Sequence, residues 1–388
     1  MPRERLQNYG RATVSDFLGR MIVYRNLEPM HPALPALSDL RPKLDLAPNR
    51  IPRKSDPDYA RVIVALLQHA QALRGTETLQ RLIYVGDTRL NDGRAFANLC
   101  RTSEWVGIAF IGSETEDPAE VEIATEEPGS LRLYLANRWA LLEDFDGYCN
   151  QQGFPMDERT AVILDLDKTT LGARGRNDHV INAARVEAVR RTVDELLGGD
   201  FDAHTFERAY TTLNQTTYHP FTTDNQDYLA AICLIVGSGL MTLESLTADI
   251  ESGKLQDFED FLETVESRVD ALPPHLQTLH HRIYERVKSG DPTPFKAFRY
   301  NEYRTTIERF GNVNDTAAPA DRVDREIVIT QAVRDIANRW KAQGALLFGL
   351  SDKPDEASIP TDALRAQGYK AIHATETHVV GRERVHLS

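Results

Sequence analysis

The chain has 388 residues, 41% of them hydrophobic and 27% charged, a balance typical of a soluble globular protein with two or three domains. A formal net charge of −13 disfavours contact with nucleic-acid phosphates and anionic lipids, so we expect neither nucleic acid nor membrane as a partner. The three cysteines are far apart and form no CxxC pair, which argues against a zinc knuckle or a disulfide framework. The N-terminal segment has no apolar signal core, and we expect a cytoplasmic protein.

The first part of the chain predicts an arm followed by a helix. Residues 1–45 look helical at first and then become rich in proline, which favours an N-terminal arm. Asp56 can cap a helix that has Pro57 at its first position, and helical periodicity runs over Tyr59–Leu73.

The next part predicts a parallel sheet. Two short apolar runs, Leu82–Val85 and Trp105–Ile111, are typical of strands joined by a helix. Residues 113–130 are acidic and are expected to form a loop. We expect Leu131–Tyr148 to form a helix and Ala161–Leu164 to form a buried strand.

Residues 175–326 have a different texture, mostly helical by pattern and punctuated by prolines, which indicates an inserted helical domain. The predicted elements after it are a helix over Ile327–Ala342 ending at Gly344, a strand over Leu346–Leu350, a helix over Pro360–Ala366 and a strand over Lys370–His373.

A pair of carboxylates, Asp165 and Asp167, directly follows the strand Ala161–Leu164. Open α/β sheets bind ligands at the carboxyl ends of their strands, so both carboxylates can reach one crevice. One can attack phosphorus while its neighbour transfers a proton. The alternative is a solvated turn in which aspartate caps a helix.

Three other segments carry residue types suited to phosphate chemistry. Gly86 permits a tight turn after a strand, and Asp87 and Asp92 supply oxygen ligands suited to Mg²⁺, although a turn with Asx caps explains them equally. Ser351 follows a strand and can donate to a phosphate or simply cap a turn. Lys54, ahead of a helix, can neutralise a phosphoryl oxygen or be an ordinary surface lysine.

Together these segments resemble the motifs of the haloacid dehalogenase (HAD) superfamily. ILDLDKTTL resembles its DxDxT nucleophile motif, LFGLSDKP its Ser/Thr motif, KSDPDYA its lysine motif and YVGDTRLNDG its acidic motif. The family order is nucleophile, cap, Ser/Thr, Lys and acidic residues, whereas this chain begins with the lysine and acidic segments. The resemblance therefore implies the same cyclic order with new termini, a circular permutation.

The resemblance implies a role for each matching residue. Asp165 would form an aspartyl-phosphate, and Asp167 would protonate the leaving oxygen and then activate water. Thr169 and Ser351 would hold phosphoryl oxygens or orient the loop, and Lys54 would balance the charge. The cofactor would be Mg²⁺, held by Asp87, Asp165 and the backbone carbonyl of Asp167, with Asp92 as a second carboxylate on the metal side or beside the lysine.

The implied fold is α/β, a three-layer HAD-like Rossmannoid parallel sheet in permuted order with an inserted all-helical cap. The expected boundaries are an arm at 1–45, the first part of the core at 46–174, the cap at 175–326 and the second part of the core at 327–388. The strand order implied by the permutation is Trp105–Ile111, Leu82–Val85, Ala161–Leu164, Leu346–Leu350, Lys370–His373.

The expected function is Mg²⁺-dependent hydrolysis of a small phosphorylated metabolite. The alternatives are a phosphotransferase or mutase on the same core, or a catalytically silent HAD-like binding protein. Arg174, Arg176 and Asn177, just after the nucleophile loop, are candidate substrate contacts, or part of a mobile hinge into the cap. Further candidates, with capping or surface charge as the alternative, form two clusters in the insertion: Tyr218, His219, Asp224, Asn225 and Gln226, and Lys296, Arg299, Tyr300 and Arg304.

Overall fold

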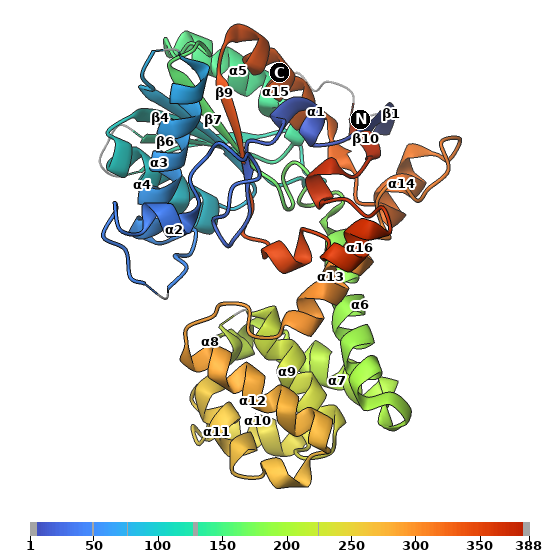
Figure 1. The fold of residues 1–388 in the computed structure, drawn as a ribbon. Coiled ribbons are helices and arrows are strands. Elements are labelled where there is room, and N and C mark those ends of the chain that lie inside the picture. The colour runs from blue at the N-terminus through green and yellow to red at the C-terminus, as the bar shows by residue number, and fades with distance from the viewer. Residues whose placement is uncertain (1–5, 49, 76, 127–130, 224, 383–388) are drawn as a thin grey trace. The chain divides into compact units, whose positions relative to one another are not determined.

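The computed structural model of the chain describes residues 6–48, 50–75, 77–126, 131–223 and 225–382 (Figure 1). It divides into two compact units. Unit 1 consists of Met1–Ala183 and Thr306–Ser388, and unit 2 of Ala184–Thr305, which lies within the expected insertion 175–326 at both ends.

Unit 1 is an α/β unit whose main sheet has seven strands in the order β2-β9-β7-β3-β4-β6-β5. All neighbours in this sheet are parallel except β5 and β6. A small sheet in the order β1-β10-β8 lies in the same unit. The strands of the main sheet are β2 (Ile22–Val23), β3 (Arg81–Gly86), β4 (Val106–Gly112), β5 (Val121–Glu126), β6 (Leu131–Ala136), β7 (Thr160–Asp165) and β9 (Leu346–Leu350), and those of the small sheet are β1 (Leu6–Ala12), β8 (Ile329–Thr330) and β10 (Thr377–Arg382).

Helices cover both faces of the main sheet (Figure 1). On one face, α2 (Leu37–Leu40), α3 (Pro57–Arg74) and α4 (Arg94–Ser103) share a hydrophobic core with sheet residues such as Tyr84 and Ile163. On the other face, α5 (Leu142–Gln151) and α15 (Gln331–Gln343) pack through an aromatic cluster that includes Phe110, Phe145 and Trp340. The central strand β7 is buried along its whole length, which explains its continuous apolar sequence. The other helices of unit 1 are α1 (Ser15–Leu18), α14 (Pro319–Arg325) and α16 (Asp362–Ala366).

The predicted centre of the sheet is confirmed. The strands expected at Trp105–Ile111, Leu82–Val85, Ala161–Leu164 and Leu346–Leu350 are β4, β3, β7 and β9, and they are neighbours in that order. The helix expected at Tyr59–Leu73 is α3, and Gly344 ends α15 with a positive φ of 111°.

The predictions at the edges of the sheet are wrong. The expected helix over Leu131–Tyr148 begins as β6, because Leu131, Leu133 and Leu135 alternate with other residues at the period of a strand. The expected loop 113–130 contains β5, which pairs antiparallel with β6. The start of the expected helix Ile327–Ala342 is the strand β8.

The far edge is also different from the prediction. The segment Lys370–His373 forms no strand, and its end lies in a 3₁₀ turn, Ile372–Ala374. The edge position beside β9 belongs to β2, from the segment expected to be an arm. The same segment forms β1, which pairs antiparallel with β10, so Leu6–Ala12 is a strand rather than part of a helix. Pairing with distant strands here outweighs local propensity.

Unit 2 is built from helices, and none of its described residues lies in a strand. Its core surrounds α9, where every residue from Leu229 to Val236 is buried. Its helices are α6 (Asp178–Leu197, which begins in unit 1), α7 (Ala203–Leu213), α8 (His219–Thr222), α9 (Gln226–Gly237), α10 (Leu243–Glu251), α11 (Phe258–Glu266), α12 (Pro274–Lys288) and α13 (Lys296–Ile307, which ends in unit 1).

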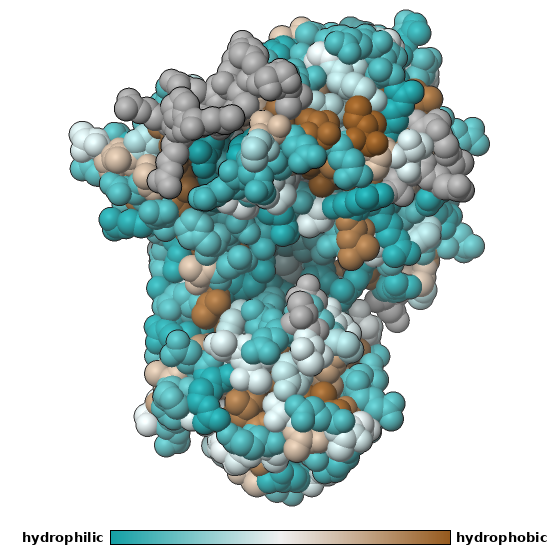
Figure 2. Space-filling view, turned by 180° about the vertical axis from the view of Figure 1, so that it is seen from behind, coloured by the Kyte–Doolittle hydropathy of each residue, from teal (hydrophilic) through white to brown (hydrophobic). Residues whose placement is uncertain are grey.

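The surface drawn in Figure 2 is predominantly hydrophilic, with apolar side chains in small scattered groups. The large exposed apolar residues are correspondingly distant in sequence: Leu73, Leu90, Val106, Ile123, Val186, Tyr300 and Tyr369. Within the described parts of the chain, no helix has both the length and the apolar character needed to cross a bilayer.

Asp355, in the 3₁₀ turn Asp355–Ala357 that follows β9, anchors the N-terminal segment. Its carboxylate accepts a hydrogen bond from the backbone N–H of Asn26 at 3.0 Å. Burial raises its pKa from 3.8 to about 7, against the effect of that N–H group. Because the folded state therefore binds this proton more tightly than the unfolded state, the stabilising contribution declines as the pH rises from about 4 to about 7.

We expect Asp355→Asn to remove this pH dependence, since the amide oxygen still accepts the Asn26 N–H. At pH 8 the variant should exceed the wild type in free energy of unfolding by roughly 2 kcal/mol, whereas at pH 4 the two should agree. Urea denaturation at both pH values measures this difference. Asp362→Asn, at a carboxylate that is 98% exposed, is the control. An equal shift in both variants contradicts the assignment.

Candidate active site

Carboxylates from two adjacent strands meet at one edge of the main sheet. Asp165 is the last residue of β7, and Asp87 follows the last residue of β3. The two strands are parallel, with Leu164 opposite Val85, so their carboxyl ends lie side by side. One turn further along the chain, Asp92 lies in a π-helical turn, Arg89–Gly93, of the kind often found at functional sites.

Lys54 joins these acids although it lies far upstream in the chain. Its ammonium group is 2.6 Å from Asp92 Oδ1 and 2.6 Å from Asp165 Oδ1. It also lies over the ring of Tyr84, 5.6 Å from the ring centre. All three members of this ion-pair network are buried. We refer to Lys54, Asp87, Asp92 and Asp165 as the acid–lysine cluster.

Asp92 orients the lysine. Its Oδ1 accepts hydrogen bonds from Lys54 and from the Tyr84 hydroxyl, which is 3.1 Å away. Its Oδ2 accepts from the N–H groups of Asp87 and Thr88 and from the Thr88 hydroxyl. Burial opposes ionisation, but Lys54 and these donors hold the pKa of Asp92 below its usual range. Of its two sequence-based roles, this geometry fits the Lys-orienting one.

Gly86 is required for this arrangement. A Cβ atom at this position would lie 2.6 Å from Cβ and from Cγ of Asp92. The sequence prediction attributed Gly86 to a tight turn, but its φ is not in the left-handed region. Its role in the structure is instead to let the Asp92 side chain approach the backbone of β3.

The negative charge of the other two carboxylates, Asp87 and Asp165, is only partly offset by nearby basic side chains. Burial raises the pKa of Asp165 well above its usual value, and Asp92 and Asp87 add to this rise although Lys54 opposes it. Burial, with Asp92, raises the pKa of Asp87 from 3.8 to about 7, although Arg174 opposes the rise. Three carboxylates thus share one lysine and one arginine, which favours an additional cation.

The donor set fits a hard divalent cation. Carboxylate oxygens of Asp87, Asp92 and Asp165 all lie within 4.8 Å of one another. Oxygen ligands of this kind suit Mg²⁺ or Ca²⁺, and the residue types alone do not distinguish the two ions. The side chain of the fourth predicted ligand residue, Asp167, is not in this group, and the sequence prediction assigned it a backbone carbonyl instead.

The loop after β7 is held tightly to the strand end. The Thr170 hydroxyl donates to the carbonyl of Asp165 at 2.7 Å, and the Thr330 hydroxyl donates to the carbonyl of Thr169 at 2.6 Å. Thr169 is fully buried, and its own hydroxyl has no hydrogen-bond partner among the described residues. Asp167 is half-buried in the same loop. Sequence reasoning missed Thr170, for which the repeated threonine was the only signal.

The three candidate substrate residues after this loop have different environments. Arg174 is one-third exposed, and its Nε lies 2.5 Å from Asp87 Oδ2. Arg176 is buried beside Glu114, at 3.5 Å. Asn177 is fully buried, and its amide hydrogen-bonds the backbone of Val323, Glu326 and Val328. In this structure Asn177 therefore fixes the end of α14 and the segment that leads into β8.

Ser351 lies just beyond β9, next to the strand of Asp165. It is buried, and its hydroxyl accepts the backbone N–H of Lys353 at 3.0 Å, as a turn-capping serine does. Lys353 is also buried, with its ammonium group 3.4 Å from the Thr306 hydroxyl. Sequence analysis did not select Lys353, although it is the second lysine at this edge of the sheet.

The candidates in unit 2 are mostly engaged within that unit. Arg299 is buried, with an ion pair to Asp227 and another to Glu302 at 2.6 Å. Asn225 caps α9, and Gln226 accepts a hydrogen bond from Tyr210. The half-buried His219 begins α8, and the hydroxyl of buried Tyr218 hydrogen-bonds Glu251. Lys296 forms an ion pair with Asp291, whereas Tyr300 and Arg304 are exposed. Asp224 lies outside the described residues.

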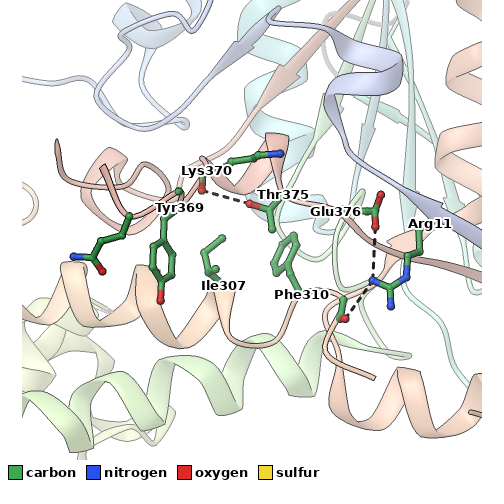
Figure 3. A pocket seen from close by; sticks show the side chains of 10 residues that line it. Arg11, Ile307, Phe310, Tyr369, Lys370, Thr375 and Glu376 are labelled. Atoms are coloured by element: carbon green, nitrogen blue, oxygen red, sulfur yellow. Dashed lines mark hydrogen bonds and ion pairs between the residues drawn. The ribbon is translucent and has the colours of Figure 1, made fainter. Parts of the chain in front are cut away.

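Two open pockets lie in unit 1. One, of about 400 Å³, is lined by Asp87, Arg89, Ser113, Glu120 and Glu122, among others, and so adjoins the acid–lysine cluster. The other, of about 380 Å³, contains no member of that cluster. In Figure 3 its apolar wall is formed by Ile307, Phe310 and Tyr369, with the Arg11–Glu376 ion pair at one end.

Comparisons with protein-family models, with curated proteins and with solved structures found no match for this chain. The HAD resemblance therefore rests on the four sequence motifs and stays a prediction.

We expect Gly86→Ala to damage the acid–lysine cluster, because its methyl group overlaps Asp92. The free energy of unfolding should fall by about 1–3 kcal/mol, the usual cost of overpacking a buried position. Gly147→Ala is the matched control, since its added Cβ, on α5, meets nothing within 4 Å. Chemical denaturation of both variants measures the difference, and an unchanged Gly86→Ala protein would contradict the assigned contact.

Proposed function

We propose that the chain is a magnesium-dependent phosphohydrolase of the HAD type, circularly permuted, with Asp165 as its nucleophile and unit 2 as a helical cap. The observation that carries this proposal is the pair of 2.6 Å contacts from Lys54 to Asp165 and Asp92, beside Asp87 at the same edge of the sheet. Residues from three distant sequence segments provide this combination of one cation and three acids.

The hydrogen bonding of Asp165 suits nucleophilic attack by its carboxylate form. Lys54 holds its Oδ1, while no described residue donates a hydrogen bond to its Oδ2. A carboxylate fixed at one oxygen and unbonded at the other can present the second to an electrophilic phosphorus. Attack forms an acyl phosphate on Asp165 and releases the leaving alcohol. Hydrolysis of this intermediate returns the carboxylate and yields inorganic phosphate.

The neighbouring residues supply the remaining functions. Half-buried Asp167 protonates the leaving oxygen and later takes a proton from water. Lys54 balances charge between the nucleophile and the phosphoryl group, and Thr169 has a free hydroxyl to offer in the same loop. Asp87, Asp165 and the Asp167 carbonyl would hold a magnesium ion. When bound, it offsets the repulsion between the carboxylates and a phosphate dianion.

The strand order supports the permutation. The order β4-β3-β7-β9 is the one that the permuted HAD arrangement implies for the acidic, nucleophile and serine segments. Lys54, which precedes α3, reaches the end of β7 although it comes first in the chain. The all-helical unit 2 is inserted between β7 and β8, the position in sequence that the family gives to a cap.

We expect Asp165→Asn to lower turnover of 4-nitrophenyl phosphate at least about a thousandfold while the fold persists. The fold persists because the burial that raises the pKa of Asp165 also makes a neutral amide acceptable, and Lys54 keeps Asp92. Steady-state kinetics and thermal unfolding measure the two effects. Unchanged turnover removes the nucleophile assignment.

Experiments on the wild-type protein separate hydrolysis from the related activities. Mass spectrometry of the protein trapped with substrate should find one phosphoryl group on Asp165, labile to hydroxylamine. Release of phosphorylated alcohol when glycerol is added would indicate a phosphotransferase. A folded protein that turns over no phosphoester with magnesium would be a silent binding protein, which contradicts the proposal.

Removal of magnesium should abolish turnover, because the acid–lysine cluster then lacks the charge to accept a phosphate dianion. Chelation should lower the rate at least about a hundredfold, and added Mg²⁺ should restore it. Asp87→Asn should raise the Mg²⁺ concentration needed for half-maximal rate by about tenfold or more. Glu122→Gln is the control, because Glu122 lines the same pocket but does not belong to the acid–lysine cluster. Full activity in the chelated protein would contradict the metal assignment.

A further inference from the structure

The side chain of Arg174 is the positive group at Asp87. Its Nε lies 2.5 Å from Asp87 Oδ2, whereas Lys54 contacts only the other two acids of the cluster. The two positively charged side chains of the site, Lys54 and Arg174, thus contact different acids. The side with Lys54 is buried, whereas the side with Arg174 is open to solvent.

The backbone of Arg174 is fixed by hydrogen bonds, whereas its side chain is partly exposed to solvent. Its N–H donates to the carbonyl of Lys168 at 2.7 Å, and its carbonyl accepts from the Glu114 N–H and the Trp139 indole. At the next residue, Gly175, a Cβ would lie 1.9 Å from the Glu114 carbonyl, so the chain is tightly packed there. The guanidinium, with about one-third of the side chain exposed, can therefore exchange partners without movement of the loop.

Asp87 cannot serve Arg174 and a divalent cation equally well. The same carboxylate belongs to the group of three whose oxygens lie within 4.8 Å of one another. A divalent cation held by this group and a guanidinium hydrogen-bonded to Asp87 repel each other at short range. The cation carries the larger charge, and Arg174 has solvent to move into.

We propose that Arg174 is an internal counter-ion of Asp87 that a divalent cation displaces, and that the freed guanidinium then binds the phosphoryl group. This inference rests on the proposed function. It makes cation binding a precondition for full phosphate binding, because Arg174 is engaged by Asp87 until the cation arrives. It also assigns Arg174 a role in the free protein, beyond the substrate contact expected from its position in the sequence.

Magnesium binding to the full chain, measured by isothermal titration calorimetry, tests the first half. Arg174→Gln removes the competing charge and should bind Mg²⁺ at least about fivefold more tightly than the wild type. Arg89→Gln is the matched control, because Arg89 lines the same pocket as Asp87 and removing it takes away the same charge. The Mg²⁺ affinity of this variant should stay within about twofold of the wild-type value. Equal tightening in both variants, or none in Arg174→Gln, overturns the inference.

A second variant and a second readout guard against a general loss of structure. Arg174→Lys keeps the charge and should bind Mg²⁺ with an affinity between those of the wild type and Arg174→Gln. In the wild type, the NMR signal of the Arg174 Nε–H group should move on titration with Mg²⁺. A signal that stays in place while Mg²⁺ binds shows that the pair with Asp87 persists, and it overturns the displacement.

Inorganic phosphate tests the second half. Mg²⁺ should increase phosphate affinity more in the wild type than in Arg174→Gln, because only the wild type gains a freed guanidinium. An equal increase in both removes the phosphate role of Arg174. If neither protein binds Mg²⁺, the proposed function itself fails and the inference fails with it. Binding with equal affinity in both proteins overturns the inference alone.

Discussion

The ion pairs of Lys54 with Asp92 and Asp165 are the interaction on which the rest of the site depends. A buried ammonium group without partners is strongly unfavourable, so the lysine needs both carboxylates, and they need it. The contact joins the segment before α3 to the ends of β3 and β7, which are distant in sequence but adjacent in the sheet. The neighbouring residues serve this contact: Gly86 makes room for Asp92, and Tyr84 donates to it. A structural lysine alone would account for the burial, but not for the additional acid, Asp87.

Asp87 changes the electrostatic character of the site from a satisfied ion-pair network to one that lacks positive charge. Asp92 has a donor for each carboxylate oxygen, and its pKa is low. By contrast, the pKa values of Asp87 and Asp165 are raised by burial and by the other carboxylates. Stability alone does not require two buried acids in this state. Acids in this state are typical of sites that hold a cation, because the cation then offsets the charge of the carboxylates.

The centre of the sheet could be predicted from the sequence because its strands are covered on both faces. β3, β4, β7 and β9 are continuous apolar runs, and the polar residues that follow them mark one edge of the sheet. The strands at and next to the edges have no such signal. β2 has two residues, and β5 and β6 alternate over stretches that also fit a loop or a helix. The partners of Asn177 could not be predicted either, because its amide binds backbone groups about 150 positions away, with no side-chain signal. The pairing of Arg174 with Asp87 depends in the same way on the fold of a loop, which short-range patterns do not encode.

The difference between the predicted and the observed structure matters most for the N-terminal segment. Expected as an arm, it instead supplies the edge strand beside β9, with Ile22 opposite Gly349 and Val23 opposite Leu350. The backbone N–H of Ser351 donates to the carbonyl of Val23, and the carbonyl of Lys353 accepts the N–H of Arg25. The segment thus fixes the backbone of the loop that carries Ser351 and protects the edge of β9, which would otherwise be free to pair with another chain. Residues 6–45 therefore belong to the architecture of the candidate site, and their contribution is the position of the serine segment relative to Asp165.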